Sequence, residues 1–166
     1  MKEQAQVLDF MKITEVGEDF WETVDVPVLM DVRGETNSFV VKVYGKFSPL
    51  KVKMCVQELI LQLDKARGKR EDAIDNISVP YMIFMIIKHF TTLKLPNSFA
   101  EQLVAIEHMT NTGTMLQIFA QMDVVEINKV QDEVQSVLEA FNSNVDKSED
   151  FIKTIKDQLV DKSLLE

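Results

Sequence analysis

Hydrophobic and polar residues alternate near the start of the chain, as they do in β-strands. The apolar residues at every second position are Val24, Val26, Val28, Met30 and Val32, and then Phe39, Val41 and Val43. The stretch RGETN, residues 33–37, supplies turn residues between the two runs, so we predict a β-hairpin over about residues 22–45. Pro27 cannot donate a ladder hydrogen bond and indicates an edge position. Because an isolated hairpin is marginal in water, its apolar face is expected to pack against the rest of the chain.

Helical spacing of the apolar residues begins after this hairpin. Ser48 and Pro49 are typical of a helix start, because a hydroxyl caps the first turn and proline fits its first position. The helix is predicted to run to about Ala66, since Gly68 stops it. The charged stretch GKREDAIDNI that follows, residues 68–77, is expected to be a loop.

The next run, residues 78–92, is apolar on nearly every side. Ser78, followed by a proline two places later, predicts a helix start, and a helix that is apolar all round is typical of a buried centre. A β-strand is the alternative, because isoleucine and aromatic residues favour strands. We prefer the helix because of the cap and the length of the run.

Further helices are predicted in the second half of the chain. Ser98 and Glu101 have the spacing of a capping box, and Asp123 and Glu126 repeat it. The helices predicted from these caps and from apolar spacing cover about residues 99–110, 114–122 and 124–141, and a last one begins at Ser148.

The predicted fold class is therefore mainly α (α+β), a bundle of about five to six helices with a small N-terminal β-hairpin. Residues 1–142 are expected to form a single globular domain. Residues 143–166 are expected to form a loosely attached C-terminal helix, because a polar stretch precedes them and they end at the terminus.

Composition narrows the class of protein. The chain has 166 residues and a formal charge of −9, the size of one globular domain. A single Cys excludes a disulfide framework. The longest apolar run, residues 81–87, is far shorter than the roughly 20 residues that span a bilayer, and no signal peptide is recognised, so neither a membrane partner nor secretion is expected.

Charge is uneven along the chain. Residues 33–70 hold 9 basic and 3 acidic groups, a balance of +6, which makes nucleic-acid binding an alternative. We do not favour a nucleic-acid partner, because Glu71 and Asp72 follow at once and the rest of the chain would repel a polyanion.

The residues that usually carry chemistry are few. His89 and His108 are the only histidines, and neither belongs to a metal-binding pattern. Cys55 lies within an apolar helical stripe, where a small buried side chain is the ordinary role, although a Cys55–His nucleophile pair is an alternative. No glycine-rich phosphate loop is present. We therefore expect no catalytic residues, metal or cofactor, and a protein that is not an enzyme.

Methionine content gives the positive indication. Nine methionines in 166 residues are many, and flexible thioethers suit surfaces that accept apolar partners, although core filling is the alternative. From composition and spacing we predict an apolar groove for a partner helix, lined by Tyr81, Met82, Met85, Ile86, Met115, Phe119 and Met122.

Three stretches carry a family resemblance: VYGKFSPLKVKMCVQELILQL, FTTLKLPNSFAEQLVAIEHMTNTG and QMDVVEINKVQDEVQSVLEAF. Over about residues 38–142 the chain resembles the small tail assembly chaperones of long-tailed bacteriophages that infect Gram-positive bacteria. The likeness consists of a strand, a helix started by Ser-Pro, a break at Leu-Pro and an acidic amphipathic helix.

The resemblance implies a non-catalytic role in the host cytoplasm. Such chaperones coat the tape measure protein, keep it soluble, and are displaced as the tail tube protein polymerises, so the chain is not expected in the mature virion. A homo-oligomer is left open. The alternatives are a structural virion or adaptor protein of the neck or tail completion type, and a helical enzyme or nucleic-acid binder.

Overall fold

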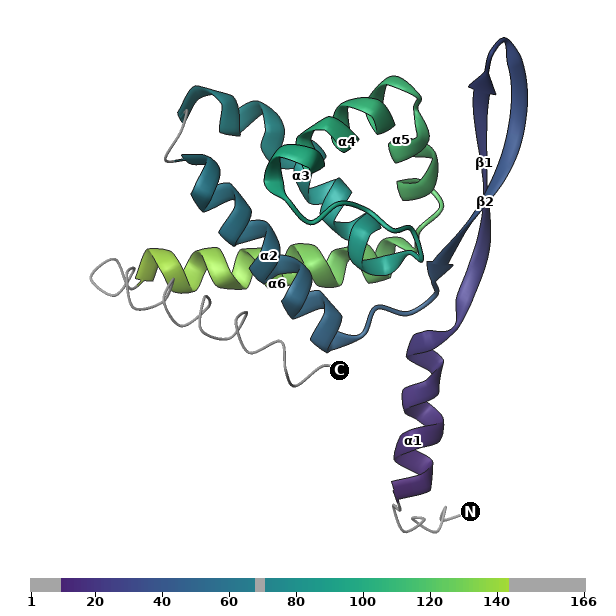
Figure 1. Ribbon diagram of the computed structural model, residues 1–166. Coiled ribbons are helices and arrows are strands. Elements are labelled where there is room, and N and C mark those ends of the chain that lie inside the picture. The colour runs from purple at the N-terminus through teal and green to yellow at the C-terminus, as the bar shows by residue number, and fades with distance from the viewer. Residues whose placement is uncertain (1–9, 68–70, 144–166) are drawn as a thin grey trace.

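The computed structural model describes residues 10–67 and 71–143. In chain order the elements are helix α1 (Phe10–Glu18), the 3-10 turn η1 (Asp19–Trp21), strands β1 (Thr23–Val32) and β2 (Glu35–Tyr44), and helices α2 (Pro49–Arg67), α3 (Glu71–Phe90), α4 (Phe99–Asn111), α5 (Thr114–Phe119) and α6 (Val124–Ser143) (Figure 1). This architecture confirms the predicted fold class, a helical bundle with a small N-terminal hairpin. The predicted helix from Ser148 lies outside the described residues.

The hairpin turns more tightly than its sequence predicted. Only Arg33 and Gly34 form the turn, and both have positive φ, 55° and 86°. Two central residues with positive φ form the turn whose twist matches that of paired strands. Glu35 and Thr36, predicted to be turn residues, therefore already belong to β2 and pair with Val32 and Asp31.

The predicted apolar face of the hairpin is buried only in its middle. Val26, Val28 and Val41 pack in the core, whereas Val32, near the turn, is exposed. Figure 1 shows the hairpin standing beside the helices with its tip free. The alternation thus predicted the strands correctly but not how much of their face is covered.

The two strands meet the helices along different stretches of edge. The side-chain amide of Gln117 in α5 makes two hydrogen bonds with the backbone of Leu29 in β1. Leu29 N donates to Gln117 Oε1 at 2.9 Å, and Gln117 Nε2 donates to Leu29 O at 2.9 Å. Gln121 Nε2 donates to Pro27 O at 3.1 Å. On β2, Thr92 N donates to Lys42 O at 3.0 Å.

Helix α3 forms the centre of the bundle, as predicted, but it begins earlier. It packs against α2, α4 and α5, and the side chains of Phe84, Met85 and Phe90 are fully buried. The helix starts at Glu71 rather than Ser78, so part of the predicted loop is helical and Pro80 lies inside the helix. A proline removes one intrahelical hydrogen bond, and burial of the apolar run offsets that loss.

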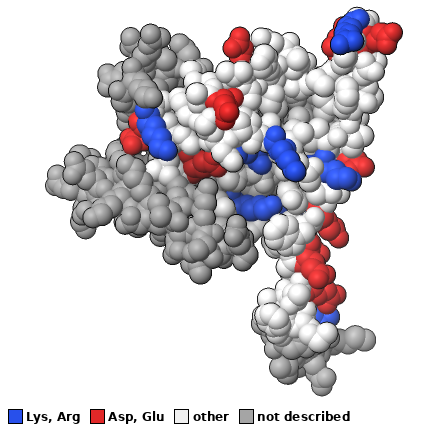
Figure 2. Space-filling model, in the orientation of Figure 1, with Lys and Arg blue, Asp and Glu red and all other residues white. Residues whose placement is uncertain are grey.

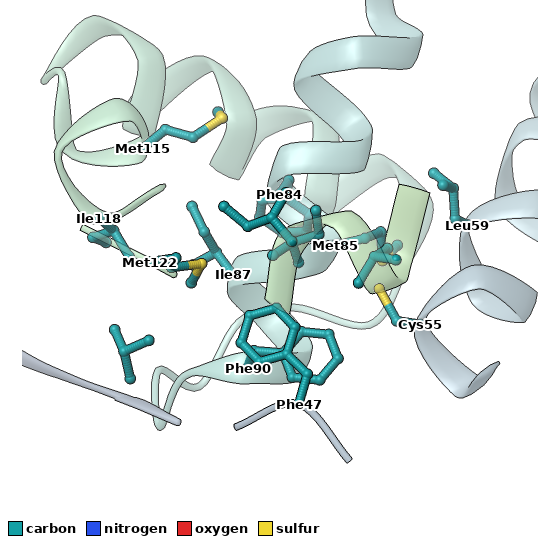
Figure 3. Close-up of a cluster of buried hydrophobic side chains, with 14 of the residues drawn as sticks. Phe47, Cys55, Leu59, Phe84, Met85, Ile87, Phe90, Met115, Ile118 and Met122 are labelled. Carbon is teal, nitrogen blue, oxygen red and sulfur yellow. The ribbon is translucent and has the colours of Figure 1, made fainter. Parts of the chain in front are cut away.

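Figure 3 shows how the core joins the hairpin to the bundle. Phe47, just before α2, stacks on Phe90 at the end of α3 with ring centroids 3.7 Å apart and planes 8° apart. Met85, Met115 and Met122 point into the same cluster.

Two of the predicted helix caps are present, those at Ser98 and Asp123, whereas Ser78 lies inside α3 and caps no helix. Glu101 N donates to Ser98 Oγ at 3.4 Å, and Val125 N donates to Asp123 Oδ1 at 2.8 Å. Glu126 does not complete the second capping box. Its carboxylate is buried and accepts from Phe47 N at 2.7 Å, which ties α6 to the start of α2.

Candidate partner-binding surface

The residues predicted to line an apolar groove lie mainly in the core. Tyr81, Met85, Ile86, Met115 and Met122 are buried, and Met82 and Phe119 are partly buried and pack against the same cluster. The structure does bring these residues together, but it does so by folding α3 against α5 and the start of α6. Core filling, the alternative reading of the methionines, describes their positions here. A partner that binds this conformation has to use other residues.

A polar cluster joins three helices behind this core. Glu58 of α2 accepts hydrogen bonds from Lys88 and, at 2.8 Å, from His89 Nε2, both on α3. Tyr81 Oη donates to Gln102 of α4, and Gln102 Nε2 donates to Pro96 O at 3.0 Å. Among the described residues no buried side-chain nitrogen or oxygen lacks a partner. The polar groups of this cluster therefore find their hydrogen-bond partners within the chain, and these bonds hold α2, α3 and α4 together.

The electrostatics of this cluster follow from burial and pairing. Burial alone would raise the pKa of Glu58, but hydrogen bonds from His89 and Lys88, together with their positive charges, lower it to about 2. Burial raises the pKa of the Cys55 thiol, and the Glu58 carboxylate raises it further. A thiol held in its neutral form is a poor nucleophile, so Cys55 has the environment of a core residue.

Helix α1 offers the opposite environment, because none of its residues is buried. Phe10, Ile13 and Val16 recur at three-residue spacing on one face, and their side chains are between 52% and 79% exposed. Met11, 81% exposed, lies on the opposite side of the helix. Figure 1 shows α1 extending away from the bundle. An exposed apolar face of this kind is suited to packing against another chain.

The root of α1 is nevertheless held firmly. Lys46 Nζ lies 2.8 Å from Asp19 Oδ2, and Gly45 N donates to Glu22 O at 3.0 Å. Trp21 meets Tyr44 edge-on, with centroids 6.3 Å apart. Lys51 Nζ lies over both rings, 4.8 Å and 3.8 Å from their centroids. These contacts fix η1 against β2 and α2, so α1 is presented as an arm with a defined direction.

Acidic residues lie on the side of this arm opposite its apolar face. Glu15, Glu18, Asp19 and Glu22 lie on α1 and its root, and Figure 2 shows acidic side chains running along this part of the molecule. Lys12 pairs with Glu15 at 3.2 Å. A helix with an apolar stripe on one side and carboxylates on the other suits an amphipathic partner helix flanked by Lys or Arg. We take these residues of α1 as the candidate partner-binding surface.

The sequence carried a signal for this surface that the methionine count obscured. Phe10, Ile13 and Val16 have helical spacing, but the stretch is short and precedes a strongly alternating segment. The polar cluster gave no comparable signal, because Glu58 and Gln102 are 44 positions apart. Within the described residues, no three His, Cys, Asp or Glu side chains gather as metal ligands, and no helix is long and apolar enough to cross a bilayer.

Comparison with known protein families identifies a match over most of the chain. The model of the YomO family, a phage-associated family, matches residues 12–166. No curated protein and no solved structure matches the chain.

Proposed function

Because this chain belongs to the YomO family, and so to a phage-associated group of proteins, we propose that it is a non-catalytic tail assembly chaperone. In this role it binds the tape measure protein in the host cytoplasm and keeps it soluble. Tail tube protein displaces it as the tube polymerises, and it is absent from the finished virion. Neither nucleic acid nor membrane is a partner in this proposal.

The exposed apolar face of α1 is the observation that carries this proposal. A tape measure protein with long apolar helical stripes, as the resemblance implies, offers a complementary surface. Each buried aliphatic or aromatic side chain contributes on the order of 1.5–3 kcal/mol at full burial, so an arm with three such side chains on one face makes a modest contact. Many copies along one rod would bind tightly together, while each remained weak enough to be displaced.

The acidic side of α1 adds selectivity. Carboxylates on the helix that carries the apolar stripe favour a target helix flanked by basic residues and repel acidic ones. The net charge of −9 on each copy also keeps a coated assembly dispersed.

We test this proposal by co-expressing the full chain with the tape measure protein of the same phage. The wild-type chain is expected to move the tape measure protein into the soluble fraction. A Phe10→Glu/Ile13→Glu variant is expected to lower binding by about thirtyfold or more, because two anchor side chains are lost, each worth about 1 kcal/mol or more. The yield of soluble tape measure protein measures the first effect, and a pull-down measures the loss of binding.

The matched control is Leu116→Glu, which places a carboxylate on an equally exposed apolar residue of α5. It should retain binding. The melting temperature of the α1 variant should match that of the wild type, because α1 buries no side chain. A tape measure protein that stays insoluble with wild-type chain would overturn the function. Binding that survives in the α1 variant would overturn the surface.

Purified virions separate this function from a structural one. A chaperone should be absent from their mass spectrum, whereas a neck or tail completion protein should be present at a fixed copy number. Detection at a fixed copy number would replace the chaperone proposal with the structural alternative.

A further inference from the structure

The middle of β2 exposes outward-facing backbone groups on an apolar stretch of edge. Val40 and Ser38 lie opposite Pro27 and Leu29 in the antiparallel register. The backbone groups of Pro27 and Leu29 point away from β2, to Gln121 and Gln117. In an antiparallel pair, facing residues of this kind both direct their N–H and C=O outward. The N–H and C=O of Ser38 and Val40 therefore face away from β1.

These four groups are open within the part of the chain that the structure describes. The next outward carbonyl along β2, that of Lys42, is taken by Thr92 N at 3.0 Å, whereas no described residue bonds the outward groups of Ser38 and Val40. Figure 1 shows this part of β2 on the side of the hairpin away from the helices. Both faces beside the edge are apolar, with Phe39 43% and Val40 63% exposed.

The edge of β1 is protected by the devices that prevent strand pairing. Pro27 has no donor, and the amide of Gln117 occupies both backbone groups of Leu29. The remaining outward positions near its two ends include Asp25 and Asp31. Residues 36–41 of β2, in contrast, contain neither a charge nor a proline.

We propose that the open edge of β2 pairs with the same edge of a second copy of this chain. The two strands run antiparallel about a two-fold axis at Phe39, so that Ser38 lies opposite Val40 of the second copy. This places four strands in one sheet, with β1 of each copy at the outside. The inference is independent of the proposed function.

A second copy is the occupant that this edge fits. In the proposed register the four outward groups of Ser38 and Val40 in one copy meet the same four groups of the other. Phe39 faces its own counterpart, which suits an edge that is apolar on both faces. Thr91 and Thr92 already occupy the edge at Lys42 and Val43, so the pairing is confined to about residues 37–41, which carry no charge. No like charges therefore meet although each chain carries −9.

The protected edge of β1 explains why pairing would stop at two copies. A sheet with two open edges can add strands without end and form fibres, whereas a sheet with one open edge pairs once and forms a closed dimer. The hydrogen bonds from Gln117 to Leu29, together with Pro27, therefore prevent a further strand from pairing with either outer edge of the four-stranded sheet.

Light scattering on the purified full chain tests this pairing. The wild type is expected to show twice the 19.0 kDa of one chain. Ser38→Pro is expected to reduce the mass to 19.0 kDa, because it removes an outward N–H while leaving the hydrogen bonds to β1 in place. The matched control Thr23→Pro alters an outward position of β1, where the preceding residue Glu22 already has the extended ψ of 135° that proline requires, and should stay dimeric.

A cysteine placed on the two-fold axis provides a second measurement. Facing residues at such a position have Cα atoms about 4.5 Å apart, within the range of a disulfide. Phe39→Cys is therefore expected to form an intermolecular disulfide on mild oxidation, and Leu29→Cys on β1 is not. The native Cys55 is buried and does not interfere. A monomeric wild type, a dimeric Ser38→Pro, or equal cross-linking of the two cysteine variants would overturn the proposal.

Discussion

Replacing Phe90 by alanine is expected to lower the free energy of unfolding by about 4 kcal/mol, the range seen when a buried aromatic ring is removed from a core. Phe90 has no exposed surface and stacks on Phe47 at 3.7 Å. Its ring lies where the end of α3 meets the segment between β2 and α2, so the cavity left behind would face three elements. Urea unfolding followed by circular dichroism measures the loss.

Leu116→Ala is the matched control for this change. Leu116 is exposed on α5, so its truncation should alter the free energy of unfolding by about 0.5 kcal/mol or less. A double-mutant cycle with Phe47→Ala should give a coupling of about 1 kcal/mol between the stacked rings. A Phe90→Ala loss as small as that of Leu116→Ala would show that the ring is not enclosed.

Acid is expected to remove a stabilising contribution of about 3 kcal/mol that Glu58 makes near neutral pH. The pKa of Glu58 is lowered from 4.5 to about 2, with His89 and Lys88 as the hydrogen-bond donors responsible. Because the folded-state pKa lies below the unfolded one, the contribution is present above about pH 4.5 and is lost as the pH falls toward 2. Urea unfolding at a series of pH values measures this dependence.

The variant Glu58→Gln isolates this carboxylate from the others, because it keeps the side-chain shape and cannot titrate. Near pH 7 it should be less stable than the wild type by about 3 kcal/mol, since it leaves the partly buried Lys88 ammonium without its counter-ion. Toward pH 2 the two proteins should become similar in stability, as both then carry an uncharged group at this position. A stability difference that does not change with pH would contradict the assignment.

Local signals were enough to predict most of the elements. The Val26–Val28 alternation predicted the hairpin, and the Ser98 and Asp123 caps placed the starts of α4 and α6 correctly. The predicted start of α3 was wrong because Ser78 and the proline two residues later have the pattern of a helix start. Position along the chain cannot show whether such a proline begins a helix or lies within one that is stabilised by tertiary packing.

The partner surface was harder to predict for a physical reason. A methionine at helical spacing looks the same in a sequence whether it faces a core or a partner, and only the arrangement of α3 against α5 decides. An α3 that is apolar all round already implied that Met85 and Ile86 are interior. The open edge of β2 could not be predicted from the sequence either. Which backbone groups of the hairpin are free depends on where Gln117 and Thr92 lie in the folded chain.

The root of α1 also provides an intrinsic optical reporter. Trp21 is the single tryptophan of the chain and is 64% exposed beside Tyr44 and Lys51. Emission excited selectively from indole therefore comes from the base of the arm alone. Docking of a helix along α1 should exclude water from this ring and shift its emission to shorter wavelength, so occupancy can be titrated without attaching a dye.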